Sequence, residues 1–594
     1  MSETLTRQLW NILQTHLKDD LLSYKSEGVY VPISTKEFGR LIEKFCLGLK
    51  DLGAKAGEKV VLLAENSPWW VIIDYAVLCL GGVTVPIYTS LVPEQVKYII
   101  NDSEAKTVIC GSPELWEKLT AVRKSLRNVK RFVLLQGQPP RGIHSLSQVM
   151  DRGQALAKKQ PKLFQKLVNA VKPGDLASIV YTSGTTGLPK GVMLSHSNFA
   201  SNINTLASII DFNPGDTELV FLPLSHVLAR MVAFAFLSRG TSLAFAESLE
   251  TVAQNLIEVK PTILVTVPRV LEKIYTRIMD TVLAGSGLKK KLFFWALRVG
   301  HQYGSLKLAG RKPGFGLSFR RSLASRLVFA KVVAKTGGRI RFMVSGGAPL
   351  SKDIAEFFYA MGLNVLEGYG LTETSPVIAV NTFEHVRFGT VGRPIPGVEV
   401  RIARDGEILT KGPNVMRGYY KKLRETREVF KGGWFHTGDI GHLDEDGYLV
   451  ITDRKKDLIV TSGGKNIAPQ PIENLFQKNS YISQAVVVGG SRKFIAALIV
   501  PDFEKLEAYA RKKEIPFQGR RDLVARQEVM DFYLDEVDRM TPHLASYEKV
   551  KKIALLDREF DIVQGEITPT LKVRRKIVEE KYKSVIEALY KENG

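Results

Sequence analysis

The sequence predicts an α/β protein, with a large N-terminal domain of parallel sheets flanked by helices and a smaller α+β C-terminal domain. Three observations predict this arrangement. Short β-rich runs alternate with helical patterns across residues 59–345, as expected of parallel sheets covered on both faces. Beyond residue 390, short strands joined by Gly and Asp turns indicate a small β-rich lobe. The 594 residues also allow at least two domains of about 100–200 residues each.

The first element expected is an amphipathic helix over residues 3–18, in which apolar residues recur at helical spacing: Leu5, Leu9, Ile12, Leu13 and Leu17. The apolar run 69–88 contains one Asp, two glycines and one proline. It is therefore expected to form a helix, a turn and a buried strand, because a membrane span needs about 20 mainly apolar residues. Further buried strands are expected at six short runs: 59–65, 106–110, 131–135, 176–183, 262–267 and 339–345.

The pattern past residue 390 predicts four short strands, at 398–403, 406–412, 447–453 and 458–464. Two more strands are expected at 485–490 and 496–500, followed by charged helices. The charged run DRKKD at residues 453–457 is predicted to be the hinge between two domains. These domains are residues 1–453, with 390–453 as a β-rich sublobe, and residues 454–594.

The composition is that of a soluble globular protein, because 24% of the residues are charged and 9% are aromatic. It excludes a mainly disordered or fibrous chain. Cys46, Cys79 and Cys110 are too far apart for a disulfide framework and lack metal-ligand spacing, which favours a reducing compartment. Acidic and polar residues precede any apolar run at the N-terminus, so no signal peptide is expected. We predict a cytoplasmic protein without a transmembrane helix, either free or peripherally attached to a membrane.

Positive charge is concentrated in residues 281–352. The whole chain has 83 Lys and Arg against 61 Asp and Glu, a net charge of +22. Residues 281–352 contain fifteen of these cations and no Asp or Glu, interleaved with apolar residues such as Phe294, Trp295 and Phe319. Basic and aromatic residues together favour docking on an anionic membrane surface. An acidic acyl carrier protein or a merely solvated basic face remain alternatives, whereas no nucleic acid is expected, because no recognised nucleic-acid module is present.

The segment YTSGTTGLPKG, residues 181–191, directly follows one of the predicted strands. Its glycines allow close approach of the backbone to a ligand, and its hydroxyls and lysine offer donors and positive charge to a polyphosphate. The spacing of a P-loop is absent, which excludes the P-loop kinases and GTPases. For a generic turn of this composition, a plain Ser/Thr/Gly surface loop would be the alternative.

In this loop the sequence resembles the ANL superfamily of adenylate-forming enzymes. Five further segments match the superfamily's motifs in the expected order: SGGAPL (345–350), EGYGLTET (367–374), TGDIG (437–441), DRKKD (453–457) and SGGKNIAPQPIE (462–473). The segment TPTLKVRRK at 568–576 occupies the place of the catalytic-lysine motif. The resemblance covers about residues 20–585, and it implies that a carboxylic acid is activated by ATP as an acyl-AMP.

The resemblance also implies how ATP is held. The phosphates would contact Thr182, Ser183, Gly184, Thr185, Thr186, Gly187 and Lys190. Glu373 and Thr182 would place Mg²⁺, which prefers hard oxygen ligands, and Thr372 would bond the α-phosphate. Adenine would lie against Tyr369, with Gly347 and Ala348 as the opposite wall. Further nucleotide-binding residues would be Pro349, Glu367, Gly368 and Gly370. Asp439 would accept from both ribose hydroxyls, with Arg454 donating to the same sugar. Taken singly, each residue has an ordinary alternative, such as a turn aspartate or a core tyrosine.

Lys572 is implied to be the catalytic lysine of adenylation. A mobile ammonium can bridge the attacking carboxylate and the α-phosphate, where negative charge accumulates. Leu571 replaces the glycine of the usual motif, a form common among long-chain members; a lysine on a solvated basic helix is the alternative. For the second half-reaction the C-terminal domain would rotate about Lys456 and present a pantetheine tunnel lined by Ser462, Gly463 and Gly464.

The acid is expected to be a medium-to-long fatty acid, because residues 222–231 and 266–275 resemble the long-chain fatty acyl-CoA synthetases. His226 and Val227 are candidate wall residues of the acyl site, although His226 is equally well explained as a residue satisfied at a helix start. ATP with Mg²⁺ and coenzyme A are the implied cofactor and co-substrate. Two alternatives remain, an acyl-[acyl carrier protein] synthetase and a catalytically silent lipid-binding protein. Lys572, Glu373 and Lys190 argue against the silent protein.

Overall fold

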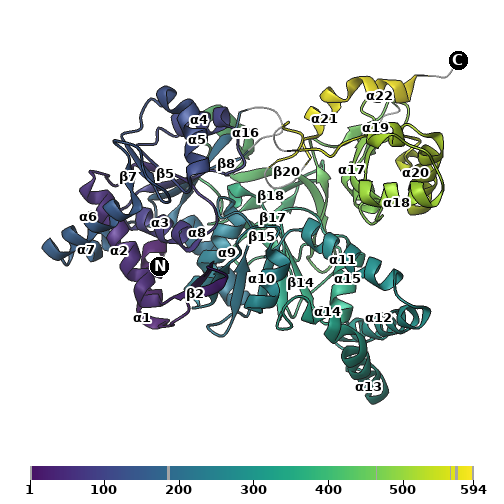
Figure 1. Cartoon of the computed structure of the whole chain (residues 1–594), viewed down its shortest axis with the longest axis horizontal. Helices are drawn as coiled ribbons and strands as arrows, with labels where there is room; N and C mark the ends of the chain where they lie inside the picture. The colour runs from purple at the N-terminus through teal and green to yellow at the C-terminus, as the bar shows by residue number, and fades with distance from the viewer. Residues whose placement is uncertain (1–2, 183–187, 463–464, 562–563, 569–572, 592–594) are drawn as a thin grey trace.

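The computed structural model describes residues 3–182, 188–462, 465–561, 564–568 and 573–591. Figure 1 shows a large body, coloured purple to green, and a smaller yellow-green lobe that carries the C-terminus. Among the described helices none is long and apolar enough to cross a bilayer. Cys46, Cys79 and Cys110 are buried free thiols.

A seven-stranded sheet forms the first half of the body, in the order β7-β6-β5-β3-β4-β8-β9. Its strands pair in parallel, except that β8 and β9 are antiparallel. The strands are β3 (Lys59–Leu63), β4 (Val83–Pro86), β5 (Thr107–Cys110), β6 (Arg131–Leu134), β7 (His144–Ser145), β8 (Leu176–Thr182) and β9 (Lys190–Ser195). The helices before and among them are α1 (Leu5–Thr15), α2 (Thr35–Asp51), α3 (Pro68–Cys79), α4 (Pro93–Asp102), α5 (Pro113–Val122), α6 (Leu146–Lys159) and α7 (Leu163–Ala170).

A nine-stranded sheet forms the second half, in the order β16-β15-β14-β13-β12-β10-β11-β1-β2. Its central strands are parallel and its outer pairs are antiparallel. The strands are β1 (Leu22–Ser26), β2 (Val29–Ile33), β10 (Thr217–Val220), β11 (Ser242–Phe245), β12 (Ile263–Thr266), β13 (Phe342–Ser345), β14 (Asn364–Gly370), β15 (Val377–Val380) and β16 (Arg393–Pro394).

Helices cover both faces of this second sheet. They are α8 (His196–Ile209), α9 (Val227–Ser238), α10 (Val252–Val259), α11 (Pro268–Leu283), α12 (Gly287–Leu308), α13 (Phe315–Ala324), α14 (Ala330–Ala334) and α15 (Lys352–Met361). Apolar residues of α3, α8 and α9 share one core with strands of both large sheets, so these helices lie between the two sheets. Residues of α10, α11, α12 and α15 form a second core on the other face of the nine-stranded sheet.

A five-stranded antiparallel sheet follows, and it is the small β-rich lobe. It consists of β17 (Glu399–Ile402), β18 (Glu407–Lys411), β19 (Phe430–Lys431), β20 (Trp434–Leu443) and β21 (Leu449–Arg454), with α16 (Leu423–Val429) beside it. The expected sequence of parallel sheets, β-rich lobe and C-terminal α+β unit is confirmed.

The C-terminal lobe has its own hydrophobic core, made of residues from Ile459 to Val578. Its strands are β22 (Ile459–Val460), β23 (Asn466–Ile467), β24 (Ile482–Val488), β25 (Ala496–Pro501) and β26 (Lys552–Leu555). Its helices are α17 (Pro469–Phe476), α18 (Phe503–Lys512), α19 (Gly519–Val524), α20 (Gln527–Met540), α21 (Arg575–Lys581) and α22 (Lys583–Tyr590). Ion pairs join this lobe to the body, between Lys505 and Asp280 at 2.7 Å and between Lys478 and Asp353 at 2.5 Å.

Most predicted elements form close to the expected residues. The run 69–88 folds into α3, a turn and β4, as predicted. Two predicted strands differ most from their expected bounds. In the run 339–345 the strand begins only at Phe342, and the side chain of the preceding Arg341 pairs with Asp211 and Asp216. Among the described residues 458–462 of the run 458–464, only Ile459–Val460 are a strand, where they pair with β23.

Candidate functional site

A cavity of about 2310 Å³ lies where the carboxyl ends of β8, β12, β13 and β14 meet the β-rich lobe and the C-terminal lobe. Ligands of open α/β sheets bind at this edge, because the loops there diverge. Every described site residue that the sequence predicted lines this cavity, with the exception of Ser462. Residues from six separate segments between Thr182 and Lys456 therefore meet at one place.

The phosphate end of the cavity is set by the β8–β9 hairpin. Thr182 and Lys190 are paired across its two strands, and both line the cavity. The Lys190 ammonium lies 5.1 Å from the centre of the Tyr419 ring. The predicted phosphate ligands Ser183, Gly184, Thr185, Thr186 and Gly187 lie outside the described residues.

Glu373 lies in a short 3₁₀ turn, Thr372–Thr374, after β14. Its carboxylate Oε1 accepts a hydrogen bond from the Tyr419 hydroxyl at 2.9 Å, and its backbone carbonyl accepts one from Met416 at 2.8 Å. Burial raises the pKa of Glu373, whereas the Tyr419 hydrogen bond opposes that rise. A carboxylate held in this way has a second oxygen available to a cation or to a ligand donor.

Tyr369 and Asp439 are in direct contact. The Tyr369 hydroxyl donates to Asp439 Oδ2 at 2.6 Å, and Arg454 Nε donates to Oδ1 at 3.2 Å. Asp439 and Arg454 are also register partners across β20 and β21. A carboxylate has about four lone-pair sites, so Asp439 can accept further bonds from a diol. The structure thus places the predicted adenine, ribose and Mg²⁺ residues around one cavity.

The floor between these groups is formed by β14. A Cβ on Gly370 would collide with the backbone carbonyl oxygen of Pro376, so this position requires glycine. Gly347 has a φ of +84°, which favours glycine in the turn that carries the exposed Ala348 and Pro349. Glu367 is buried and its Oε1 has no hydrogen-bond partner among the described residues. That oxygen is a candidate partner for a ligand group.

Glu367 should also make stability depend on pH. Burial raises its pKa to about 8 from an ordinary 4.5. Between pH 4.5 and 8 the folded protein therefore keeps a proton on Glu367 that the unfolded chain has lost. The contribution of Glu367 to folding stability is full below pH 4.5 and disappears as pH rises through 8. We expect Glu367→Gln to reduce the fall in the free energy of unfolding between pH 5 and pH 9, which is followed through the melting temperature. The reduction is at most roughly 1.4 kcal/mol for each unit of difference between the folded and unfolded pKa. Glu218, also buried with a pKa near 8 but absent from the cavity wall, provides the matched variant Glu218→Gln.

The Glu367 experiment has a second readout. Both variants should flatten the pH profile, but only Glu367→Gln should also change how much ATP raises the melting temperature. An unchanged pH profile in Glu367→Gln would contradict the proton assignment.

Both acyl-site candidates line the cavity. His226 is the N-cap of α9, and its Nδ1 accepts from the Leu228 backbone amide at 3.1 Å. His226 is thus satisfied at a helix start, as the alternative expected, and it also lines the cavity. Apolar residues of α9 extend the wall from Val227 to Phe236.

The segment predicted to be the hinge, residues 453–457, leads from β21 to the C-terminal lobe. Asp453 Oδ2 accepts from the Gln470 amide at the start of α17 at 3.2 Å, which ties the two sides together. Lys455 pairs with Asp405 at 2.6 Å and Glu407 at 2.9 Å in the β-rich lobe. Lys456 is exposed and lines the cavity.

Of the predicted pantetheine strand, the described residue Ser462 does not line the cavity. Ser462 is exposed away from the cavity wall, and its amide donates to the Arg492 carbonyl at 2.9 Å. Gly463 and Gly464 lie outside the described residues.

Lys572 also lies outside the described residues, but the residues on either side of it line the cavity, namely Ile567, Thr568, Val573, Arg574 and Arg575. Ile567 and Val573 form a β-bridge. Arg575 pairs with the buried Glu473 at 2.8 Å.

Sequence reasoning missed Tyr419. Its hydroxyl holds Glu373 and its ring faces Lys190, so it connects two predicted groups that are 183 residues apart in the chain. No local motif marks it in the segment VMRGYYKK. Only the fold brings it to the cavity.

Comparisons with known proteins agree with this geometry. Residues 15–420 match the family described as AMP-binding enzyme, and residues 456–594 match the AMP-binding enzyme C-terminal domain. The chain is 37% identical over 571 residues to the long-chain-fatty-acid–CoA ligase FadD15 of Mycobacterium bovis, covering 95% of this chain and 93% of that protein. It is 32% identical to the peroxisomal long chain acyl-CoA synthetase 7 of Arabidopsis thaliana, covering 92% and 79% of the two chains.

A solved structure shares the fold at lower identity. The anthranilate CoA ligase AuaEII, crystallised in complex with anthranoyl-AMP, superimposes with a TM-score of 0.73 over 99% of this chain and 98% of that one. The sequence identity is 19%, so this likeness concerns the fold.

Proposed function

This chain belongs to the family of AMP-binding enzymes, and from that membership we propose that it is an ATP-dependent long-chain-fatty-acid–CoA ligase. The observation that supports this most strongly is the single cavity in which the polar nucleotide residues and long apolar walls adjoin. A substrate with an ionic head and a long alkyl tail needs both surfaces side by side. Burial of the tail stabilises binding by about 0.8 kcal/mol per methylene.

The proposed reaction has two steps. A fatty acid carboxylate oxygen attacks the α-phosphorus of ATP, the bond to pyrophosphate breaks, and acyl-AMP forms. The thiol sulfur of coenzyme A, having lost its proton, then attacks the acyl carbon, and AMP leaves. In the first step two anions must approach each other, so the site has to supply positive charge and hydrogen-bond donors. We assign this work to Lys190, Lys572 and the loop residues between Thr182 and Lys190.

Magnesium is proposed to accompany ATP. Mg²⁺ in nucleotide enzymes is held by one or two carboxylates together with substrate phosphates. Glu373 fits this role, because it lines the cavity and its carboxylate is oriented by the hydrogen bond from the Tyr419 hydroxyl. The Thr182 hydroxyl is the second protein group proposed for the site. A bound Mg²⁺ would neutralise charge on the leaving pyrophosphate.

We propose that residues 1–453 and 454–594 are domains that change orientation between the two steps. Lys456 is the proposed pivot, and Asp453 and Lys455 tie the hinge to its neighbours on either side. In the orientation described here Ser462 is away from the cavity, whereas the residues flanking Lys572 line it. This favours the adenylation orientation, and rotation would be needed to bring Ser462 to the thiol path.

A direct assay tests the function. Purified protein with palmitate, ATP and Mg²⁺ should release pyrophosphate, and with coenzyme A it should produce AMP and palmitoyl-CoA in equal amounts. Replacement of coenzyme A by phosphopantetheinylated acyl carrier protein distinguishes the two acceptors, and we expect thioester only with coenzyme A. A panel of acids from acetate to long chains should give the highest kcat/KM for long chains. No acid-dependent pyrophosphate release with any member would refute the proposal.

Peripheral attachment to a membrane is part of the proposal. The basic segment 281–352 forms α12 and α13, which stand out from the body in Figure 1. We propose that this pair of helices docks on an anionic bilayer from which the fatty acid is drawn.

A further inference from the structure

A buried ion pair joins the two halves of the body close to the start of α9. Arg230 of α9 and Asp74 of α3 are 1% and 0% exposed. Arg230 Nε donates to Asp74 Oδ2 at 2.7 Å, and Arg230 Nη2 donates to Asp74 Oδ1 at 2.6 Å. The two groups therefore form a bidentate pair, which fixes the orientation of both side chains.

The remaining guanidinium nitrogen of Arg230 reaches the strand that leads to the predicted phosphate loop. Arg230 Nη1 donates to Ser178 Oγ at 2.6 Å, and Ser178 Oγ donates in turn to the Thr84 carbonyl of β4 at 2.7 Å. Ser178 belongs to β8 and precedes Thr182 by four residues, or about 13 Å along the strand. Arg230 thus connects a helix of the acyl side with two strands of the seven-stranded sheet.

Aromatic rings surround the rest of the guanidinium group. Its central carbon Cζ lies 5.8 Å from the ring centre of Trp70 on α3, 5.3 Å from that of Phe199 on α8 and 5.6 Å from that of Phe234 on α9. A desolvated cation is attracted to the faces of aromatic rings. The Arg230 side chain is therefore held by three other elements, α3, α8 and β8, and its position is closely defined.

The first turn of α9 presents its other face to the cavity. His226 and Val227 line the cavity wall, whereas Arg230 does not. The Arg230 backbone amide donates to the His226 carbonyl at 3.1 Å, so the ion pair lies one helical turn from the predicted acyl-site residues. A shift of Arg230 against α3 would therefore move this wall relative to the strand that leads to Thr182.

A second polar link holds the segment that enters α9 to the same half of the body. Asn66 precedes α3 and lines the cavity, and its Nδ2 donates to the Leu222 carbonyl at 2.7 Å. Its Oδ1 accepts from the Leu224 amide at 2.9 Å. Asn66 and Asp74 together therefore fix the segment before α9 and the first turn of the helix.

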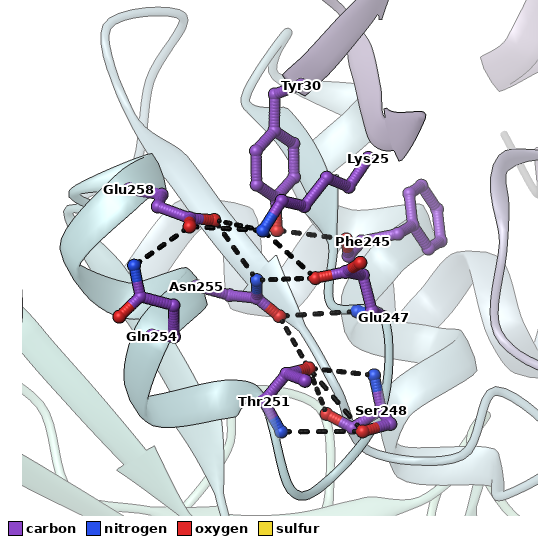
Figure 2. Close-up of polar contacts among 9 residues, drawn as sticks. All are labelled: Lys25, Tyr30, Phe245, Glu247, Ser248, Thr251, Gln254, Asn255 and Glu258. Carbon is purple, nitrogen blue, oxygen red and sulfur yellow. Dashed lines mark hydrogen bonds and ion pairs between the residues drawn. The ribbon is translucent and has the colours of Figure 1, made fainter. Parts of the chain in front are cut away.

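Figure 2 shows a polar cluster of a different kind. Lys25 of β1 pairs with Glu247 at 3.1 Å and with Glu258 at 2.9 Å, and both carboxylates follow β11 of the same nine-stranded sheet. This cluster joins parts of one half of the body, whereas the pair of Arg230 and Asp74 spans both halves.

Stability alone does not account for a charged pair at this place. Removal of two charges from water is costly, and replacement of a buried ion pair by apolar side chains of similar volume is often neutral or stabilising. Apolar side chains cannot supply the directional bonds that set one geometry between α9 and β8. Positioning therefore explains the pair better than stability does.

We propose that Arg230 is a positioning residue for acyl-AMP formation, held by Asp74 and acting on β8 through Ser178. It sets the distance between the α9 wall of the acyl site and the strand that leads to the ATP phosphates. The inference rests on the proposed function, because acyl-AMP formation is the step that it assigns to Arg230. Misplacement of reacting groups by about 1 Å can lower a rate by about 100-fold. The second half-reaction begins with the acid already joined to AMP, so it does not need this distance to be set.

A double variant replaces the pair by apolar side chains. Asp74→Leu/Arg230→Met should keep a melting temperature close to that of the unaltered protein. Its kcat for palmitate-dependent exchange of pyrophosphate into ATP should fall by about 100-fold, while synthetic palmitoyl-AMP is still converted to palmitoyl-CoA at the unaltered rate. A merely structural pair would affect both half-reactions equally or neither, and either result would overturn the proposal.

A second variant decides the question if the double variant does not fold. Ser178→Ala keeps the ion pair and removes only the hydrogen bond to β8. We expect kcat for the exchange to fall by about tenfold, less than in the double variant, because Asp74 still holds the guanidinium. Exchange at the unaltered rate in Ser178→Ala would overturn the proposal, whether or not the double variant folds.

The matched control is Glu58→Leu/Arg131→Met. Arg131 of β6 pairs with Glu58, which directly precedes β3 in the same seven-stranded sheet, and neither residue lines the cavity. Both half-reactions should be unchanged in this control. If the unaltered protein shows no exchange with any acid, the proposed function fails and the role of Arg230 falls with it. If the unaltered protein and the folded double variant exchange equally fast, only the role of Arg230 fails.

Discussion

Replacement of Lys572 by alanine is expected to abolish acyl-AMP formation, while a supplied acyl-adenylate is still converted to the thioester. The ammonium is needed only where negative charge accumulates between the attacking carboxylate and the α-phosphate. Loss of one preorganised donor at such a point costs about 10²–10³ in kcat, and loss of its full charge should cost at least as much. The second step proceeds at the acyl carbon and, in the proposed rotation, without this lysine nearby.

Two assays on the same preparation check this prediction. Exchange of labelled pyrophosphate into ATP reports the first step, and coenzyme A acylation by synthetic palmitoyl-AMP reports the second. Lys576→Ala is the matched control, because Lys576 is an exposed lysine on the neighbouring helix α21 and does not line the cavity. Equal loss of both half-reactions in Lys572→Ala would refute the role given to this lysine.

The fold was largely predictable because its signals are local. Buried parallel strands appear as short apolar runs, and α3 followed by β4 was identified from the glycines that interrupt one such run. The strand at 339–345 was overestimated at its start, because Arg339 and Arg341 alternate with apolar residues as they would in a strand, whereas the strand begins at Phe342.

The candidate site was predictable only where its residues belong to contiguous sequence motifs. Asp439 and Tyr369 belong to separate motifs, and the structure joins them by a hydrogen bond. Tyr419 was missed because its role depends on Glu373 and Lys190, to which it is linked by folding and not by spacing.

Replacement of Glu373 is expected to have the second-largest effect, and it acts on the metal requirement. Glu373→Ala removes the only carboxylate proposed for Mg²⁺, so the Mg²⁺ concentration for half-maximal adenylation should rise by about 100-fold or more. Tyr419→Phe keeps the carboxylate and removes only the hydroxyl that donates to it at 2.9 Å. Loss of such an orienting partner costs about 10–100-fold in metal affinity, so the two variants should form a graded series.

The pH dependence distinguishes a metal ligand from a merely structural carboxylate. Burial raises the pKa of Glu373 and the Tyr419 hydrogen bond lowers it, so loss of the hydroxyl should raise the pKa further. Mg²⁺ binds the deprotonated form of Glu373. As pH is lowered, the apparent affinity for Mg²⁺ should therefore begin to fall at a higher pH in Tyr419→Phe than in the unaltered protein. The measurement is adenylation rate against Mg²⁺ concentration at several pH values. If both variants keep the metal requirement of the unaltered protein at every pH, Glu373 does not hold the ion.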